Sequence, residues 1–166
     1  PVVTAAALAT MTTRVQIRAG SCVIPLHHPV RVAEDWAFVD NLSNGRVGIS
    51  FASGWQPNDF VLAPQNFANR QQVMVEHIDT VRRLWSGEAV PFAGPKGDMV
   101  PTRTLPRPVQ KDIPVWITAA GNPKTFEQAG AMGCSLLTHL LGQSVDDVAE
   151  KLRLYRDAGI PVMTGG

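Results

Sequence analysis

Hydrophobic positions between residues 26 and 55 predict a helix followed by a buried strand. Pro29 suits the first turn of this helix, because a proline lacks the N–H that would have no partner there. Asn44 and Gly45 end it, since both residues tolerate the left-handed backbone conformation. Four apolar residues recur at helical spacing and would form one stripe facing a core: Val32, Trp36, Val39 and Leu42.

The strand that follows this helix has the composition of a strand covered on both faces. Residues 47–52 are mostly apolar and carry no charge, which is typical of parallel sheets. Small, polar and aromatic residues come directly after it, at positions 53–56. A helix that leads into such a strand is the building unit of a parallel α/β sheet or barrel.

The rest of the chain alternates helix and strand in the same way. Further strands are predicted at residues 15–24, 115–118 and 136–140, and the first has a bulge or close-approach point at Ala19-Gly20-Ser21. Further helices are predicted at residues 4–11 and 69–86, from residue 123 onward, and from 144 to about 158. Residues 53–68 and the long excursion 89–112 are interpreted as irregular, because proline and glycine interrupt any period there.

Polar residues at the predicted helix starts support these boundaries. Asn69 with Gln72 resembles a capping pair, and Ser144 with Asp147 has the spacing of a capping box. Asn122 stands where an N-cap is expected, directly before a proline at the first helical position.

The alternation gives four strands, each leading into or out of a helix. Successive units of this kind imply parallel pairing with right-handed crossovers. A complete (β/α)₈ barrel needs roughly 250 residues, so this chain supplies only about half of one. We therefore expect a single α/β domain over residues 1–166, built either as an open doubly wound sheet or as a partial TIM (β/α)₈ barrel with about four parallel βα units.

Composition narrows the classes of partner and location. The formal net charge is +1, which gives no signal for nucleic acid or an anionic membrane surface, and no apolar run is long enough to span a membrane. Cys22 and Cys134 lie in apolar stretches and make no disulfide framework, so a reducing cytoplasm is the expected location. The chain lacks an initial methionine and its end resembles the start of another element, so it reads as a piece of a longer protein.

Candidate chemistry gathers beyond the carboxyl ends of the predicted strands, where ligands bind in both architectures. Gly121, Asn122 and Thr125 place backbone N–H groups, an amide and a hydroxyl at a helix N-terminus, which suits a phosphate. Asn122 would serve equally well as a plain helix cap, so both interpretations stay open. Residues 52–55 let a planar ligand approach the backbone, although pattern alone favours a simple turn with Trp55 packed under the excursion.

The remaining polar residues carry weaker signals. His27 and His28 could act as acid, base or ligand, but no spacing of histidine and cysteine resembles a metal site, so no metal is expected. His77 is expected to be solvated in its helix, and Glu34 to pair locally with Arg31. The chain has no nucleophile elbow, no P-loop and no dinucleotide-binding fingerprint.

Several stretches together resemble the bacterial luciferase-like flavin monooxygenases. The longest is HHPVRVAEDWAFVDNLSNGRVGISFASGW, and the others are VRRLWSGEAV, LPRPVQKDIPVWITAAGNPKTFEQAGAMG and LTHLLGQSVDDVAEKLRLYRDAG. They occur in the family's order and cover nearly the whole chain. Their sequences are most similar to a branch of the family found in natural-product assembly lines.

The resemblance implies a (β/α)₈ barrel that uses reduced FMN, supplied by a reductase, and O₂ to oxidise a small organic substrate. It places a bulge with a non-proline cis peptide against the flavin ring at Ala19 and Gly20. The ring would also be bordered by Ala52, Ser53, Gly54 and Trp55. The phosphate would be bound by Gly121, Asn122 and Thr125. A deazaflavin in place of FMN remains open, as does a half-barrel module that binds flavin or phosphate without catalysis.

The resemblance also implies that this chain corresponds to the third to sixth strands of the barrel. The family's first strands, with a histidine used in its chemistry, would precede Pro1, and its last two βα units would follow Gly166. A half-barrel exposes apolar edges, so we expect a homodimer or docking with the rest of a parent chain. The substrate would be held partly by the excursion 89–112.

Overall fold

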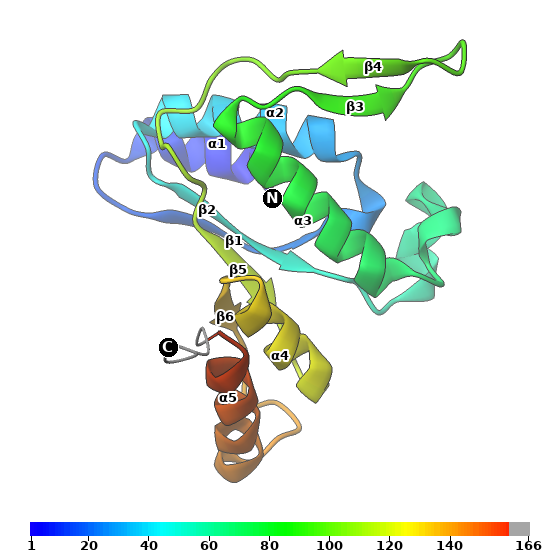
Figure 1. Ribbon diagram of the computed structural model, residues 1–166. Coiled ribbons are helices and arrows are strands. Elements are labelled where there is room, and N and C mark those ends of the chain that lie inside the picture. The colour runs from blue at the N-terminus through cyan, green and yellow to red at the C-terminus, as the bar shows by residue number, and fades with distance from the viewer. Residues whose placement is uncertain (160–166) are drawn as a thin grey trace, which may run out of the picture. The chain divides into compact units, whose positions relative to one another are not determined.

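The computed structural model describes residues 1–159 (Figure 1). The chain divides into two compact units, one comprising residues 1–114 and the other beginning at Val115. Over the described residues each unit contributes two strands that lead into helices, so the predicted alternation of strand and helix is confirmed. Within this part of the chain, no helix combines the length and the apolar character that crossing a membrane requires.

The first unit is built on two parallel strands, β1 and β2, which pair from Ile17 opposite Val47 to Val23 opposite Ala52. The register shifts between Gly20 and Cys22, so the predicted bulge at Ala19-Gly20-Ser21 is confirmed. The elements of this unit are α1 (Val2–Met11), β1 (Ile17–Val23), α2 (Pro29–Ser43), β2 (Val47–Ala52), α3 (Arg70–Ser86), β3 (Val90–Ala93) and β4 (Met99–Thr102), with three short 3₁₀ helices η1 (Ile24–Leu26), η2 (Pro57–Leu62) and η3 (Pro64–Asn66).

Helix α2 begins and ends where the sequence predicts. His28 is its N-cap and accepts a hydrogen bond from the Val30 N–H, and Asn44 adopts the left-handed conformation at its end. Leu42 departs from the prediction, because its side chain is 41% exposed while Ser43 is buried. At 100° per residue Ser43 falls closer than Leu42 to the centre of the apolar stripe, so the serine takes the buried position.

Arg46, buried at the start of β2, holds α1 in place. Its guanidinium donates to the carbonyl oxygens of Ala9 (3.0 Å), Thr12 (2.7 Å) and Val15 (2.6 Å), and its Nε donates to Ser43 O at 2.6 Å. The carbonyls at a helix end lack partners within the helix, and a buried guanidinium requires acceptors for its donors. The carbonyl oxygens at the end of α1 and the guanidinium donors of Arg46 therefore satisfy one another.

Helix α3 buries the predicted apolar residues but starts differently. Met74, Ile78, Val81 and Trp85 are all buried, and Gly87 ends the helix with a φ of 93°. The predicted capping pair is wrong: Asn69 makes no side-chain cap, and Gln72 donates to Glu76 Oε1 at 2.8 Å instead. Asn69 has a ψ of 20° rather than the extended backbone of an N-cap, so its side chain does not reach the first-turn N–H groups.

The predicted irregular excursion 89–112 contains an antiparallel hairpin. Strands β3 and β4 pair from Val90 opposite Thr102 to Ala93 opposite Met99, which places Pro91 directly opposite Pro101. An antiparallel ladder alternates between pairs that exchange N–H groups and pairs that do not. Two prolines facing each other fit a pair of the second kind, so their missing donors do not disrupt the strands.

The rest of the excursion is held to α2 by a buried carboxylate and to α3 by a tryptophan. Asp40 is fully buried and accepts hydrogen bonds from the Val109 N–H (2.8 Å), the Gln110 N–H (2.9 Å) and Gln110 Nε2 (2.7 Å). Gln110 in turn accepts from Trp85 Nε1 at 3.0 Å and donates to Val47 O at 3.0 Å. Residues 109–110 therefore lie at the amino end of β2.

The second unit pairs β5 (Val115–Thr118) with β6 (Ser135–Leu137) in parallel and carries α4 (Pro123–Ala131) and α5 (Val145–Gly159). Strand β6 is shorter than the predicted 136–140. The two helices approach each other closely at Gly130, where an added Cβ would lie 2.1 Å from the Tyr155 carbonyl oxygen.

The predicted capping box of α5 is confirmed. Asp147 Oδ2 accepts from the Ser144 N–H at 2.9 Å, and Ser144 Oγ accepts from the Asp147 N–H at 3.1 Å. The Ser144 N–H and the Ser144 hydroxyl both donate to the Asp147 carboxylate, and these hydrogen bonds to its charged form lower the pKa of Asp147. Cys22 and Cys134 are both buried, and burial raises the pKa of the Cys22 thiol to about 11.

Candidate functional site

The bulge in β1 presents bare backbone on one face of the strand. The peptide bond between Gly20 and Ser21 is cis, so the expected non-proline cis peptide is found in this stretch. Gly20 is exposed and has no side chain, whereas Ala19 is buried on the opposite side of the strand. Of the two predicted ring-contacting residues, Ala19 therefore offers only its backbone, and Gly20 is the one open to a ligand.

The turn after β2 is fixed at Gly54. Its φ is +81°, and an added Cβ would lie 2.8 Å from Val23 Cγ1 and 3.0 Å from Phe60 Cε2. Arg70 Nε donates to the Gly54 carbonyl oxygen at 3.1 Å, which holds the turn from its outer side. A glycine is required here on both counts, since the conformation disfavours a side chain and the space admits none.

Trp55 corrects one interpretation of this turn. A tryptophan packed under the excursion would be buried, but Trp55 is 82% exposed. The indole therefore lies free beside the small residues Ala52, Ser53 and Gly54, which are all partly exposed. Within the first unit, the structure brings this turn to the carboxyl end of β1, because Val23 pairs with Ala52 and contacts Gly54.

The second unit holds the other predicted group, at the start of α4. Asn122 Oδ1 accepts from the Lys124 N–H at 3.1 Å, so the plain capping role is confirmed. The Thr125 N–H donates to Asn122 O at 3.1 Å. Gly121 is exposed, with no protein atom within 4 Å of where a Cβ would lie.

Capping by Asn122 leaves groups that an anion can still use. The cap occupies the amide oxygen but not the amide nitrogen, which remains a donor. Thr125 is partly exposed in the first turn, where the helix dipole favours negative charge. The amide nitrogen of Asn122, the Thr125 hydroxyl and the open backbone at Gly121 therefore fit a phosphate group.

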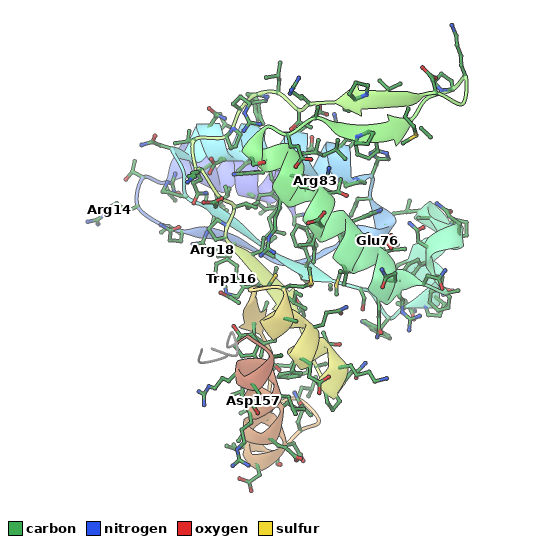
Figure 2. All side chains as sticks on the ribbon, in the orientation of Figure 1. Arg14, Arg18, Glu76, Arg83, Trp116 and Asp157 are labelled. Atoms are coloured by element: carbon green, nitrogen blue, oxygen red, sulfur yellow. The ribbon has the colours of Figure 1, made fainter. Side chains whose placement is uncertain are left out.

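A cavity of about 520 Å³ in the first unit brings three histidines together. It is lined by His27, His28 and His77, with Glu76 and Phe92 among the other residues, and the rings of His28 and Phe92 lie 5.3 Å apart. Figure 2 shows the side chain of Glu76 on α3. The described residues include no group of three or more potential ligands that could hold a metal ion.

His77 is not solvated as predicted. Its Nδ1 is buried and has no hydrogen-bond partner, and burial lowers its pKa, opposed by a hydrogen bond to the Ile24 backbone. The residue lies beside the stripe of Met74, Ile78 and Val81 on α3, and this position at the stripe's edge was the available signal.

Arg31 pairs with both neighbouring acids on the surface of α2. Its guanidinium lies 3.3 Å from Glu34 Oε2 and 2.9 Å from Asp35 Oδ1. The predicted pairing with Glu34 is confirmed, and these three residues take no part in the candidate site.

Comparison with known proteins gives one consistent family. A family model described as luciferase-like monooxygenase matches residues 1–161. The oxygenase component of the flavin-dependent trigonelline monooxygenase of Acinetobacter baylyi is 30% identical over 155 residues, which are 92% of this chain and 42% of that protein. The F420-dependent glucose-6-phosphate dehydrogenase of Amycolatopsis mediterranei is 34% identical over 166 residues, covering 96% of this chain and 46% of that protein.

A solved structure agrees with these relatives. Monooxygenase RslO1 from Streptomyces bottropensis superposes with a TM-score of 0.83 at 30% identity, over 96% of this chain and 49% of that one. The chain thus spans about half the length of the curated relatives and structures it matches. Of the two architectures left open by the sequence, the partial barrel is confirmed.

Proposed function

The chain belongs to the luciferase-like monooxygenase family, and we propose that the protein it represents uses reduced FMN and O₂ to oxygenate a small organic substrate in natural-product biosynthesis. A separate reductase supplies the reduced flavin in this proposal. The trigonelline relative is itself described as an oxygenase component, which supports a division of labour of this kind.

The observation that carries the proposal is the surface at the carboxyl ends of β1 and β2. Gly20 and the turn 52–54 present backbone and small side chains, and the exposed indole of Trp55 stands beside them. A planar ring system can approach such a surface without displacing side chains, and an aromatic neighbour adds contact area. The flavin ring is a ligand of this shape.

The roles of the residues follow from their chemistry. Gly20, Ser53 and Gly54 offer backbone groups to the ring, and the Arg70–Gly54 hydrogen bond keeps the turn in one conformation. Asn122 and Thr125 donate hydrogen bonds to the phosphate at the start of α4. When bound, the reduced flavin supplies the electrons with which O₂ is activated.

A deazaflavin is the second candidate cofactor, because the Amycolatopsis relative is described as F420-dependent. The two candidates differ in the reaction they support: oxygenation consumes O₂, whereas a dehydrogenase transfers a hydride. Oxygen uptake with reduced FMN and a supplied reductase favours the monooxygenase. FMN binding without any oxygen uptake in the full-length protein favours the non-catalytic flavin-binding module.

Thr125→Ala tests the phosphate assignment. Loss of one hydrogen bond to a charged group costs about 1.5–3 kcal/mol, so the Kd for FMN should rise about ten- to hundredfold. Flavin fluorescence in a titration measures this change. Thr13→Ala, on an exposed bend in the first unit, serves as the matched control and should leave the Kd unchanged. Equal FMN affinity in both variants contradicts the assignment.

A further inference from the structure

An apolar groove of about 640 Å³ lies on the segment that follows the Gly54 turn. We call it the η2–η3 groove and define it by its lining residues: Pro57, Asn58, Phe60, Val61, Pro64 and Phe67. Asn58 is the single polar side chain among these six. Val61 is 80% exposed, whereas its neighbour Phe60 is buried.

The groove is continuous with the turn that borders the proposed flavin ring. Phe60, which forms part of its floor, packs against Gly54 so closely that an added Cβ would lie 3.0 Å from the Phe60 ring. Phe67 meets Phe60 edge to face, with ring centroids 5.0 Å apart. Phe60 therefore lines the groove on one side and contacts the turn on the other.

Arg70 makes this arrangement rigid. Its Nε donates to Gly54 O at 3.1 Å, its Nη1 donates to Phe67 O at 3.0 Å, and its guanidinium carbon lies 4.8 Å from the centroid of the Phe67 ring. One side chain thus fastens the start of the segment to its end. A groove held in one shape before its ligand arrives binds that ligand with a smaller loss of conformational entropy.

We propose that the η2–η3 groove binds the apolar part of the substrate, an aromatic ring or an alkyl chain, next to the flavin ring. The inference rests on the proposed function and adds the substrate class to it. The six lining residues offer hydrophobic contact and a single amide, so a molecule that enters must be largely uncharged on the side that faces them. Asn58 provides one hydrogen bond with which to orient it.

The size of the groove favours a small molecule over a protein. A stable protein interface buries about 800 Å² on each partner and draws on 20–30 residues, whereas this groove is lined by six residues from one short segment. Its volume lies within the range of roughly 300–1,000 Å³ that is usual for small-molecule sites.

The groove adds to the substrate contact predicted from the sequence. Within the excursion 89–112, residues 109–110 lie at the amino end of β2, whereas Phe92 lines a cavity with His27 and His28, which follow the carboxyl end of β1. Ligands of this fold gather at the carboxyl ends of the strands. The segment 57–67 leaves β2 at that end, so the groove is placed for the same role.

Val61→Asp tests the proposal with Val3→Asp as its matched control. Both valines are about four-fifths exposed, at 80% and 81%, so a charge is tolerated at either position, and Val3 lies on α1 outside the groove. The probe is 2-naphthol, and binding is followed by its fluorescence without flavin present. We expect Val61→Asp to weaken 2-naphthol binding about tenfold, because the bound probe would cover the valine side chain and this aliphatic contact is lost. Val3→Asp should leave the binding unchanged.

Two further measurements separate this inference from the proposed function. Propane-1,2-diol, a polar probe, should not displace 2-naphthol, and the FMN titration should give the same Kd in both aspartate variants. Equal 2-naphthol affinity in the two variants overturns the groove assignment while leaving flavin binding intact. Groove-dependent 2-naphthol binding in a full-length protein that binds no flavin overturns the proposed function instead.

Discussion

His77 shows at the scale of one residue how burial sets chemistry. Its helix carries polar residues on the outside, yet the imidazole faces a cavity with a buried Nδ1 that has no partner. Burial disfavours the charged form most, the hydrogen bond to Ile24 opposes this, and His28 adds to the lowering of the pKa while Glu76 counters it. The neutral imidazole is therefore favoured in the folded protein.

Stability should fall as the pH drops below 6.5, because the unfolded chain then binds a proton at His77 more readily than the folded protein does. The loss continues down to the lower pKa of the folded state, and well above pH 6.5 this residue contributes no slope. Urea unfolding at pH 7.5 and pH 5.5 measures the effect. His77→Gln should reduce the pH dependence, whereas His139→Gln, at an exposed position, should reduce it less. An identical slope in both variants contradicts the role of His77.

Elements in the first unit are joined by buried polar contacts as well as by apolar packing. Asp40 on α2 accepts three hydrogen bonds from residues 109–110, and Arg107 donates to the carbonyl oxygens of Leu84 and Trp85 at the end of α3. Both contacts satisfy backbone groups that the secondary structure leaves unpaired. Residues 107–110, which follow the hairpin and which we call the strap, are therefore held to both α2 and α3.

Asp40→Asn should destabilise the protein by about 2–4 kcal/mol, because an amide N–H₂ replaces one acceptor oxygen and faces donors. The free energy of urea unfolding measures this loss. Asp35→Asn is the matched control, since that carboxylate makes a surface ion pair with Arg31 and is worth less than about 1 kcal/mol. A similar small loss in both variants would show that the strap contributes little.

The whole molecule is about half the length of its matched relatives and exposes apolar side chains outside the candidate site. Helices α1 and α2 pack together in the first unit (Figure 1). Leu8 and Met11 on α1 and Phe38 and Leu42 on α2 are exposed. Exposed apolar residues of this number are typical of a surface that another chain or segment covers.

We expect this chain to form a homodimer or to dock with the rest of a parent chain. Light scattering across a range of concentrations should show a mass above that of a single chain of 17.9 kDa. Phe38→Glu should shift the mass toward the monomer, because it places a charge among apolar contacts. A monomer without aggregation at every concentration contradicts the expectation.

The sequence by itself determined the elements whose boundaries depend on local backbone chemistry. Asn44 and Gly87 stop helices because they adopt a left-handed conformation, and the Ser144–Asp147 box starts one because its groups lie three residues apart. Strand 47–52 was predicted with its observed bounds, since a continuous uncharged apolar run suits burial on both faces. The family was likewise predicted from the sequence, because several short stretches resemble it and occur along the chain in the family's order.

Only the tertiary structure decided the features that depend on what lies opposite a residue. The hairpin required Pro91 to face Pro101, and the burial of Asp40 required a strap almost 70 residues away along the chain. The exposure of Trp55 and the η2–η3 groove likewise depend on which parts of the chain cover a residue. Sequence patterns report local periodicity, whereas these features depend on long-range contacts.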